Sequence, residues 1–303
     1  IHPAGVETLE QAGHEVLDQP DEATFDEALP RAAGLIVRSA TQVTPDLIER
    51  AGELKVVGRA GVGVDNIDLD ACKARGIVVA NTPGASTNAV AELTFAHMLA
   101  AARNLPLAIT SMRQGEWTKK ECKGHELKGR TLGLVGIGRI GARVAELAQA
   151  FGMQVEAFDP YVTQERAEQL GVAALHEDVL DLAASVDVVS VHTPLTPETK
   201  GLVGQAFFEA AGEGLIVVNC ARGGVVDEAA LVDALDAGQV LAAGLDVYAQ
   251  EPPGRTEVTT HQRVSTTPHV GAATHEAQRE AGVLVAQAVL DGLAGKDPES
   301  RVA

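Results

Sequence analysis

The sequence predicts an α/β chain in which two parallel β-sheets are each covered by helices. Short apolar runs rich in β-branched residues alternate with segments of helical length, which is the pattern of parallel strands joined by helical crossovers. The alternation occurs in two separate series, one ending near Ala80 and the other beginning at Thr131. A length of 303 residues is also typical of about two domains.

The first series predicts three buried strands with helices between them. Thr44 is a suitable N-cap, and Pro45 has the fixed φ that suits a first helical position. The expected strands are Gly34–Arg38, Leu54–Gly58 and Ile77–Ala80, and the expected helices are Thr44–Ala51 and Leu69–Arg75.

A long Ala-rich stretch interrupts the alternation and predicts one helix over Ser86–Leu105. The polar segment Gln114–Lys128 follows and predicts a loop or lid that contains the single Trp. We interpret Lys119, Lys120 and Lys123 in this segment as a solvated face. The strands expected in the second series are Leu132–Val135, Val155–Phe158, Val186–Val191, Leu215–Val218 and Ala242–Asp246.

Composition and charge exclude several classes of protein. The formal net charge of −18 disfavours nucleic acid and anionic lipid as partners, because both need a basic surface. No apolar run reaches the roughly 18 residues of a membrane span. The three cysteines, Cys72, Cys122 and Cys220, form neither a disulfide framework nor a zinc motif, so we expect a cytoplasmic protein without a metal site.

A glycine-rich turn marks a dinucleotide site. Gly136, Gly138 and Gly141 follow a predicted strand and open a predicted helix, which is the context that this motif requires. The first glycine permits the tight turn, the second lets a pyrophosphate approach the backbone, and the third allows close packing of helix and strand. The free N–H groups at the start of the helix attract phosphate, and Arg139 adds a charge.

The next strand ends at Asp159, 18 positions after Gly141. A carboxylate at this place accepts hydrogen bonds from a ribose 2′-hydroxyl and repels a 2′-phosphate. Pro160 and Tyr161 follow, so neither next residue is a cation that could receive such a phosphate. These residues favour NAD over NADP.

Three later loops contain side chains suited to the reduction of a 2-keto acid. The planar guanidinium of Arg222 can pair with a carboxylate and a carbonyl oxygen. His269 is suited to proton transfer near neutral pH, and Glu251 would orient it and favour its protonated form. Cys220 has no local base, so we interpret it as a wall of the site, and we interpret His97 as a packed residue of the long helix.

With these motifs in this order, the chain resembles the D-isomer-specific 2-hydroxyacid dehydrogenase family over its whole length. The resemblance implies that Arg222 anchors the substrate, that Glu251 is the partner of the histidine, and that His269 is the acid/base. It further implies cofactor contacts at Arg139, Ile140, Asp159, Thr193, Cys220, Ala221, Asp246 and Ala272. The motif segments are Gly136–Gly141, Phe158–Pro160, His192–Thr196, Asn219–Gly224, Leu245–Pro252 and Pro268–Thr274.

The same resemblance implies two Rossmann/flavodoxin-like domains, with the nucleotide-binding domain inserted in the substrate domain. We expect the substrate domain at residues 1–84 and 269–303 and the NAD-binding domain at residues 85–268. A homodimer formed through the long helix and the lid is also expected. The family's first strand would precede Ile1, so we expect a short leading segment before the present start.

Residues of the first series suggest a phosphorylated substrate. Arg38 and Arg59 end two strands, and Gly61, Val62 and Gly63 could present successive N–H groups to an anion. Two arginines at strand ends would offset the negative charge of the chain around such a ligand. Relatives that act on glyoxylate or hydroxypyruvate usually lack the arginine at position 59. Val62 departs from the family, where Thr is common, so only its backbone N–H can serve.

The favoured function is therefore the NAD-dependent oxidation of D-3-phosphoglycerate to 3-phosphohydroxypyruvate, at the entry to serine synthesis. A first alternative keeps the chemistry but uses glyoxylate, hydroxypyruvate or D-lactate. A second alternative belongs to another class, an NAD-sensing binding protein similar to the corepressors of this family.

Overall fold

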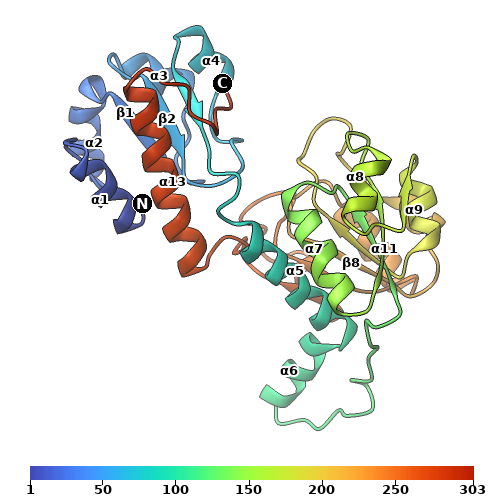
Figure 1. Cartoon of the computed structure of the whole chain (residues 1–303). Helices are drawn as coiled ribbons and strands as arrows, with labels where there is room; N and C mark the ends of the chain where they lie inside the picture. Colours follow the sequence, from blue (N-terminus) through green and yellow to red (C-terminus); the bar gives the residue numbers. More distant parts are fainter. The chain divides into compact units, whose positions relative to one another are not determined.

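The computed structural model describes all 303 residues, which form two compact units (Figure 1). Unit 1 comprises Ile1–Ala89 and Ala272–Ala303, and unit 2 comprises Val90–Gly271. Unit 2 is thus inserted in unit 1, and the predicted α/β class is confirmed. The sequence-based boundaries at residues 84/85 and 268/269 lie slightly earlier than those of the structure, because the first crossing runs inside a continuous helix, Thr87–Ala102.

Unit 1 contains a three-stranded parallel sheet in the order β1-β2-β3. The long C-terminal helix α13 (His275–Leu293) packs against β2 and against the N-terminal helix α1, so the two ends of the chain share one core (Figure 1). Thr44 caps α3 through Leu47 N at 3.3 Å, as predicted. The other elements are α1 (Pro3–Gln11), α2 (Glu22–Ala28), η1 (Leu29–Arg31), β1 (Gly34–Val37), α3 (Pro45–Arg50), β2 (Val56–Arg59), α4 (Leu69–Ala74) and β3 (Val78–Ala80).

Unit 2 contains a seven-stranded parallel sheet in the order β10-β9-β8-β7-β4-β5-β6. The chain order reverses between β4 and β7, which is the switch point of a doubly wound sheet. One buried cluster includes residues of α9 (Val179–Ser185), α10 (Gln205–Ala210) and α11 (Glu228–Asp236), and the other includes residues of α5 (Thr87–Ala102) and α7 (Arg139–Ala150). The strands are β4 (Thr131–Val135), β5 (Gln154–Phe158), β6 (Ala174–His176), β7 (Val188–Val191), β8 (Leu215–Asn219), β9 (Val240–Leu245) and β10 (Val264–Thr266).

The helices of unit 2 begin with α5 (Thr87–Ala102), whose first turn belongs to unit 1, and α6 (Leu105–Arg113). The prediction of a single helix over Ser86–Leu105 is therefore wrong at the C-terminal end of that helix. Asn104 adopts a left-handed backbone with φ 50°, and a second helix starts beyond it. The remaining helices are α7 (Arg139–Ala150), α8 (Gln164–Gln169), α9 (Val179–Ser185), α10 (Gln205–Ala210), α11 (Glu228–Asp236) and α12 (Glu257–Thr260).

The segment 114–128 contains neither helix nor strand, as predicted. Together with α6 it extends away from the sheet of unit 2 (Figure 1). None of the helices combines the length and the apolar character that crossing a bilayer requires.

Candidate active site

The residues predicted for catalysis and cofactor binding in unit 2 all follow the carboxyl ends of strands in one sheet. Because these strands are parallel, the loops after them emerge at the same edge, where doubly wound sheets bind ligands. Gly136–Gly141 follow β4, Asp159 follows β5, Thr193 follows β7, Cys220–Arg222 follow β8, Asp246 and Glu251 follow β9, and His269 follows β10.

The glycine-rich turn has the geometry of a pyrophosphate cradle. Gly136 has φ 95°, and a Cβ on Gly141 would lie 2.3 Å from the Gly136 carbonyl oxygen, so both positions require glycine. Gly138 is the N-cap of α7, has no side chain to cap the helix, and has open space where a Cβ would lie. The amino end of this helix is therefore open to an anion.

Asp159 braces this turn. Its Oδ2 accepts a hydrogen bond from the amide of Ile137 at 2.9 Å, and its Oδ1 accepts one from the amide of Tyr161 at 3.0 Å. Each carboxylate oxygen keeps further acceptor capacity, as a ribose hydroxyl would need.

Two buried polar atoms beside the turn have no partner. They are Oγ1 of Thr193 and Nδ1 of His192. Burial lowers the pKa of His192 to about 4, so its ring is neutral at ordinary pH. A buried hydroxyl without a hydrogen-bond partner lowers the stability of the fold unless a bound ligand supplies that partner. Thr193, the open helix end and Asp159 therefore fit a dinucleotide.

The loop after β8 is held by Asn219, which begins a motif segment but received no role from the sequence. Its Oδ1 accepts from the amide of Ala221 at 3.0 Å, and its Nδ2 donates to the carbonyl oxygen of Arg222 at 2.9 Å. The guanidinium of Arg222 donates to the Ala221 carbonyl oxygen at 2.8 Å and is half-buried. A side-chain amide four residues before the glycine pair Gly223-Gly224 was the only signal available for this brace.

His269 and Glu251 form a pair. Nδ1 of His269 lies 2.7 Å from Oε2 of Glu251, and the Tyr248 amide donates to Oε1 of Glu251 at 3.1 Å. The His269 side chain remains 48% exposed. The histidine has a left-handed backbone with φ 52°, which is rare outside glycine.

Asp246 has a structural role that the motif did not reveal. The residue is fully buried, and its carboxylate accepts hydrogen bonds from the amides of Val270 and Gly271, each at 2.8 Å. Its backbone oxygen accepts from the amide of His269, also at 2.8 Å. Asp246 therefore determines the conformation of the loop that contains the histidine, whether or not it also contacts a cofactor.

The buried thiol of Cys220 is unreactive at neutral pH. Burial, and secondarily the charge of Asp246, raise the pKa of its thiol to about 12. The reactive thiolate is therefore scarce at neutral pH, which agrees with the interpretation of Cys220 as a wall.

The residues predicted for substrate binding lie in unit 1, at the carboxyl end of its sheet. Arg38 follows β1 and is exposed, whereas Arg59 ends β2 and is half-buried. The guanidinium of Arg59 donates to the Ala60 carbonyl oxygen at 2.6 Å. Gly61 donates its amide to the Arg59 carbonyl oxygen at 2.8 Å, so this amide is not available to an anion and the expected nest is reduced to Val62 and Gly63. The predicted contact Ala272 begins the second segment of unit 1 and is exposed.

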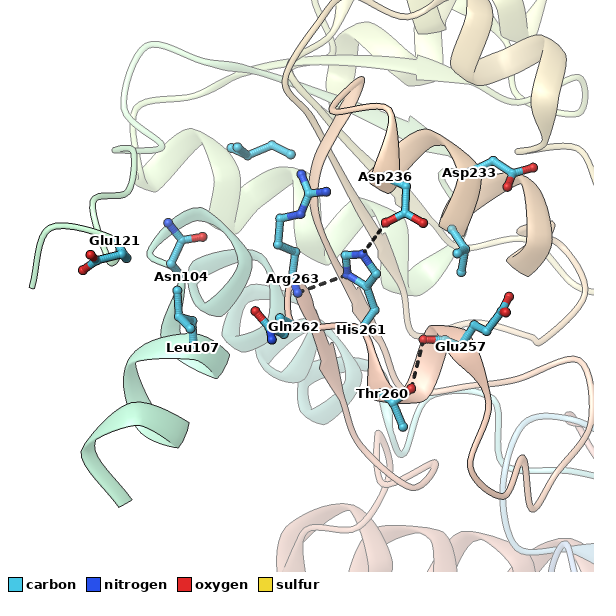
Figure 2. Close-up of a pocket in the computed structure, with 12 residues that line it drawn as sticks. Asn104, Leu107, Glu121, Asp233, Asp236, Glu257, Thr260, His261, Gln262 and Arg263 are labelled. Carbon is cyan, nitrogen blue, oxygen red and sulfur yellow. Dashed lines mark hydrogen bonds and ion pairs between the residues drawn. The ribbon is translucent and has the colours of Figure 1, made fainter. Parts of the chain in front are cut away.

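Unit 2 also contains a pocket of about 840 Å³ at the opposite edge of its sheet (Figure 2). It contains none of the predicted site residues, because His261 and Arg263 precede β10 and Asp236 precedes β9. Within it, Nε2 of His261 lies 3.4 Å from Oδ1 of Asp236, as Figure 2 shows. Neither here nor elsewhere do three or more His, Cys, Asp or Glu side chains gather as metal ligands would.

Comparison with known families gives one match that covers more than half of the chain. Residues 95–271 match the model of the D-isomer specific 2-hydroxyacid dehydrogenase, NAD binding domain. The chain is also 46% identical to D-3-phosphoglycerate dehydrogenase of Methanocaldococcus jannaschii over 303 residues, which are 100% of this chain and 58% of that protein. It spans about half the length of the curated relatives it matches.

Two solved structures are informative. The NAD⁺-bound 3-phosphoglycerate dehydrogenase of Entamoeba histolytica has a TM-score of 0.83 at 31% identity, covering 99% of this chain and 93% of that one. A glyoxylate reductase from Paecilomyes thermophila has a TM-score of 0.87 at 30% identity, covering 99% and 94%. The shared fold is thus common to proteins named for different substrates.

Proposed function

The chain belongs to the D-isomer-specific 2-hydroxyacid dehydrogenase family, with unit 2 as its NAD-binding domain, and we propose that it oxidises D-3-phosphoglycerate to 3-phosphohydroxypyruvate. The observation that carries the dehydrogenase chemistry is the pairing of His269 with Glu251 on the sheet edge that contains the dinucleotide turn. The identity of 43–49% to proteins named D-3-phosphoglycerate dehydrogenase supports the choice of substrate. Turnover of D-3-phosphoglycerate with NAD, followed through the absorbance of NADH, tests it.

The residues of unit 2 divide the chemistry between them. Oε2 of Glu251 accepts a hydrogen bond from Nδ1–H of His269, so Nε2 carries no proton and can take the proton of the 2-hydroxyl. Arg222 pairs with the substrate carboxylate and holds the oxygen on C2 as the C=O bond forms. The hydrogen on C2 leaves with its electron pair. NAD, when bound, supplies the acceptor for this hydride. The acid thereby loses two electrons and becomes a 2-keto acid, and His269 later releases its proton to solvent.

We assign phosphate selection to Arg38 and Arg59, the two arginines at the strand ends of unit 1. A guanidinium forms charge-assisted, bidentate hydrogen bonds with phosphate. The chain carries a net charge of −18, so a dianionic substrate needs local cations of this kind.

Replacing Arg59 with Leu tests this assignment. We expect kcat/KM for 3-phosphohydroxypyruvate to fall about 10- to 100-fold, the value of a lost hydrogen bond to a charged group. The value for hydroxypyruvate, which lacks the phosphate, should change little. Arg31→Leu removes the same charge from an exposed site in the same unit and serves as the control. Equal losses on both keto acids would remove Arg59 from phosphate selection.

We assign the choice of NAD over NADP to Asp159. Replacing it with Asn removes the charge that repels a 2′-phosphate but keeps one oxygen for the Ile137 amide. The ratio of kcat/KM with NADH to that with NADPH should fall by at least about tenfold. The exposed Asp181→Asn is the matched control. An unchanged ratio would show that another group selects the cofactor.

We also propose that two copies associate through α6 and the segment after it. Leu105, Ile109, Met112 and Trp117 expose large apolar side chains there, with Trp117 79% exposed. A cluster of such side chains on an element that extends from its unit marks an interaction surface. Light scattering should give a mass twice that of one chain.

The free cysteines fit a reducing compartment such as the cytoplasm.

A second candidate is the reduction of glyoxylate or hydroxypyruvate. The similarity to a structure named glyoxylate reductase favours it, since the two chains share 30% identity across nearly their full lengths. Its site would use the same histidine, glutamate and arginine, so only the substrate distinguishes the two proposals.

A further inference from the structure

His97, in the third turn of α5, lies far in sequence from the catalytic motifs but is joined to the catalytic loop by hydrogen bonds. The side chain is buried, with 2% of its surface exposed. Its Nδ1 lies 3.1 Å from Oγ of Ser265, and its Nε2 lies 2.8 Å from Oγ1 of Thr267. Thr267 Oγ1 in turn lies 2.6 Å from Oδ1 of Asp246.

The carboxylate of Asp246, at the end of this chain of hydrogen bonds, determines which atom is the donor and which the acceptor in each bond. The Asp246 carboxylate already accepts from the amides of Val270 and Gly271, so the Thr267 hydroxyl donates to it. Thr267 Oγ1 therefore accepts from Nε2–H of His97. Nδ1 is then the acceptor for the Ser265 hydroxyl. Burial lowers the pKa of His97, which outweighs the opposing effect of Asp246 and keeps the ring neutral.

Gly244, which has no side chain, leaves the space that the ring of His97 occupies. A Cβ on Gly244 of β9 would lie 2.5 Å from the Cβ of His97 and 3.1 Å from its Nδ1. Gly244 pairs with Ser265 in the parallel register of β9 and the edge strand β10, so the imidazole lies beside these two strands. Any side chain at position 244 would displace it.

We infer that His97 is a positioning residue for His269, acting through Thr267 and Asp246. Asp246 receives the hydroxyl of Thr267 and the amides of Val270 and Gly271, and its backbone oxygen receives the amide of His269. These bonds hold residues 267–271 in the conformation that gives His269 a positive φ and keeps it opposite Glu251. His97 holds Thr267 in place, and a chain of hydrogen bonds that ends on a carboxylate strengthens each member.

This inference rests on the proposed function only for its kinetic test. The first variant is Thr267→Val, which removes the hydroxyl while keeping the shape of the side chain. We expect kcat to fall about tenfold or more with a smaller change in KM, because a small displacement of a catalytic group strongly lowers the rate. Thr267→Ser, which restores the hydroxyl, should recover most of the rate. His97→Leu should resemble Thr267→Val, and the double variant should lose no more than the worse single variant, since both break one chain.

Thr8→Val is the control, because Thr8 is a half-buried threonine of α1 whose hydroxyl donates to the Ala4 carbonyl oxygen within that helix. It should retain the wild-type kcat. A wild-type kcat in Thr267→Val, or additive losses in the double variant, would overturn the inference.

A second readout does not depend on turnover. Nitrogen-15 NMR of the histidine rings in the whole protein should show His97, identified by the signal missing in His97→Leu, as the neutral Nε2–H form. The ring signals of His269 should move in Thr267→Val and stay unchanged in Thr8→Val. A protein that has these signals but is inactive on 3-phosphohydroxypyruvate, hydroxypyruvate and glyoxylate would contradict the proposed function alone. An Nδ1–H or charged His97, or His269 signals that do not move, would overturn the positioning role.

Discussion

Replacing His269 with Gln lowers kcat by about 10²- to 10⁴-fold, the range of general acid–base catalysis. The amide of Gln occupies a similar volume but cannot take a proton from the 2-hydroxyl at neutral pH. The dinucleotide turn and its braces follow other strands, so NADH affinity should remain close to that of the wild type. Steady-state kinetics in both directions and NADH fluorescence titration measure the two quantities separately.

Two further variants make this result specific. His14→Gln changes an exposed histidine of unit 1 and should leave kcat unchanged. Glu251→Gln keeps an acceptor oxygen near Nδ1 but loses the charge, so its loss should be smaller than that of His269→Gln. A His269→Gln protein that retains wild-type kcat would remove this histidine from the mechanism, and the pair with Glu251 would then be structural.

Arg222 should give the second largest effect. Arg222→Gln removes the cation that we assign to the substrate carboxylate and the oxygen on C2, and we expect kcat/KM to fall about 10²- to 10³-fold, as when one donor to a developing oxyanion is lost. Arg222→Lys keeps the charge without the planar fork and should recover only part of the loss. The Asn219 brace holds the backbone of this loop and remains in both variants.

The control for this series is Arg166→Gln on the exposed surface of α8, which removes the same charge from the same unit. If Arg222→Gln raised KM and left kcat unchanged, the arginine would bind the acid equally in the ground and transition states. Unchanged kcat and KM would exclude it from substrate binding altogether.

The sequence predicts that the candidate site residues of unit 2 follow strands of one sheet, because one strand-loop pattern accounts for their positions. An apolar run long enough to be recognised as a strand precedes Gly136, Asp159 and Arg222. His269 differs, because its strand β10 has only three residues. β6, also of three residues, and the first two helices were likewise not predicted. Such short elements are stabilised by their neighbours in the sheet, and their own sequence contains little periodicity.

Side-chain networks between distant segments could not be predicted either. His97 is packed, as expected, but its connection to Thr267 links positions separated by 170 residues and depends on how α5 crosses β9. The role of Asp246 as an anchor for the loop 267–271 likewise depends on the pairing of β9 with β10. The break at Asn104 depends on a left-handed residue that a helical pattern does not reveal.

The most direct test of the proposed function is the oxidation of NADH by the purified protein with 3-phosphohydroxypyruvate, hydroxypyruvate and glyoxylate measured in parallel. We predict that kcat/KM is highest for the phosphorylated keto acid by at least about tenfold, because each charged hydrogen bond to phosphate contributes about that factor. A preference for glyoxylate or hydroxypyruvate would contradict the proposed substrate and leave the two strand-end arginines of unit 1 without the role assigned to them.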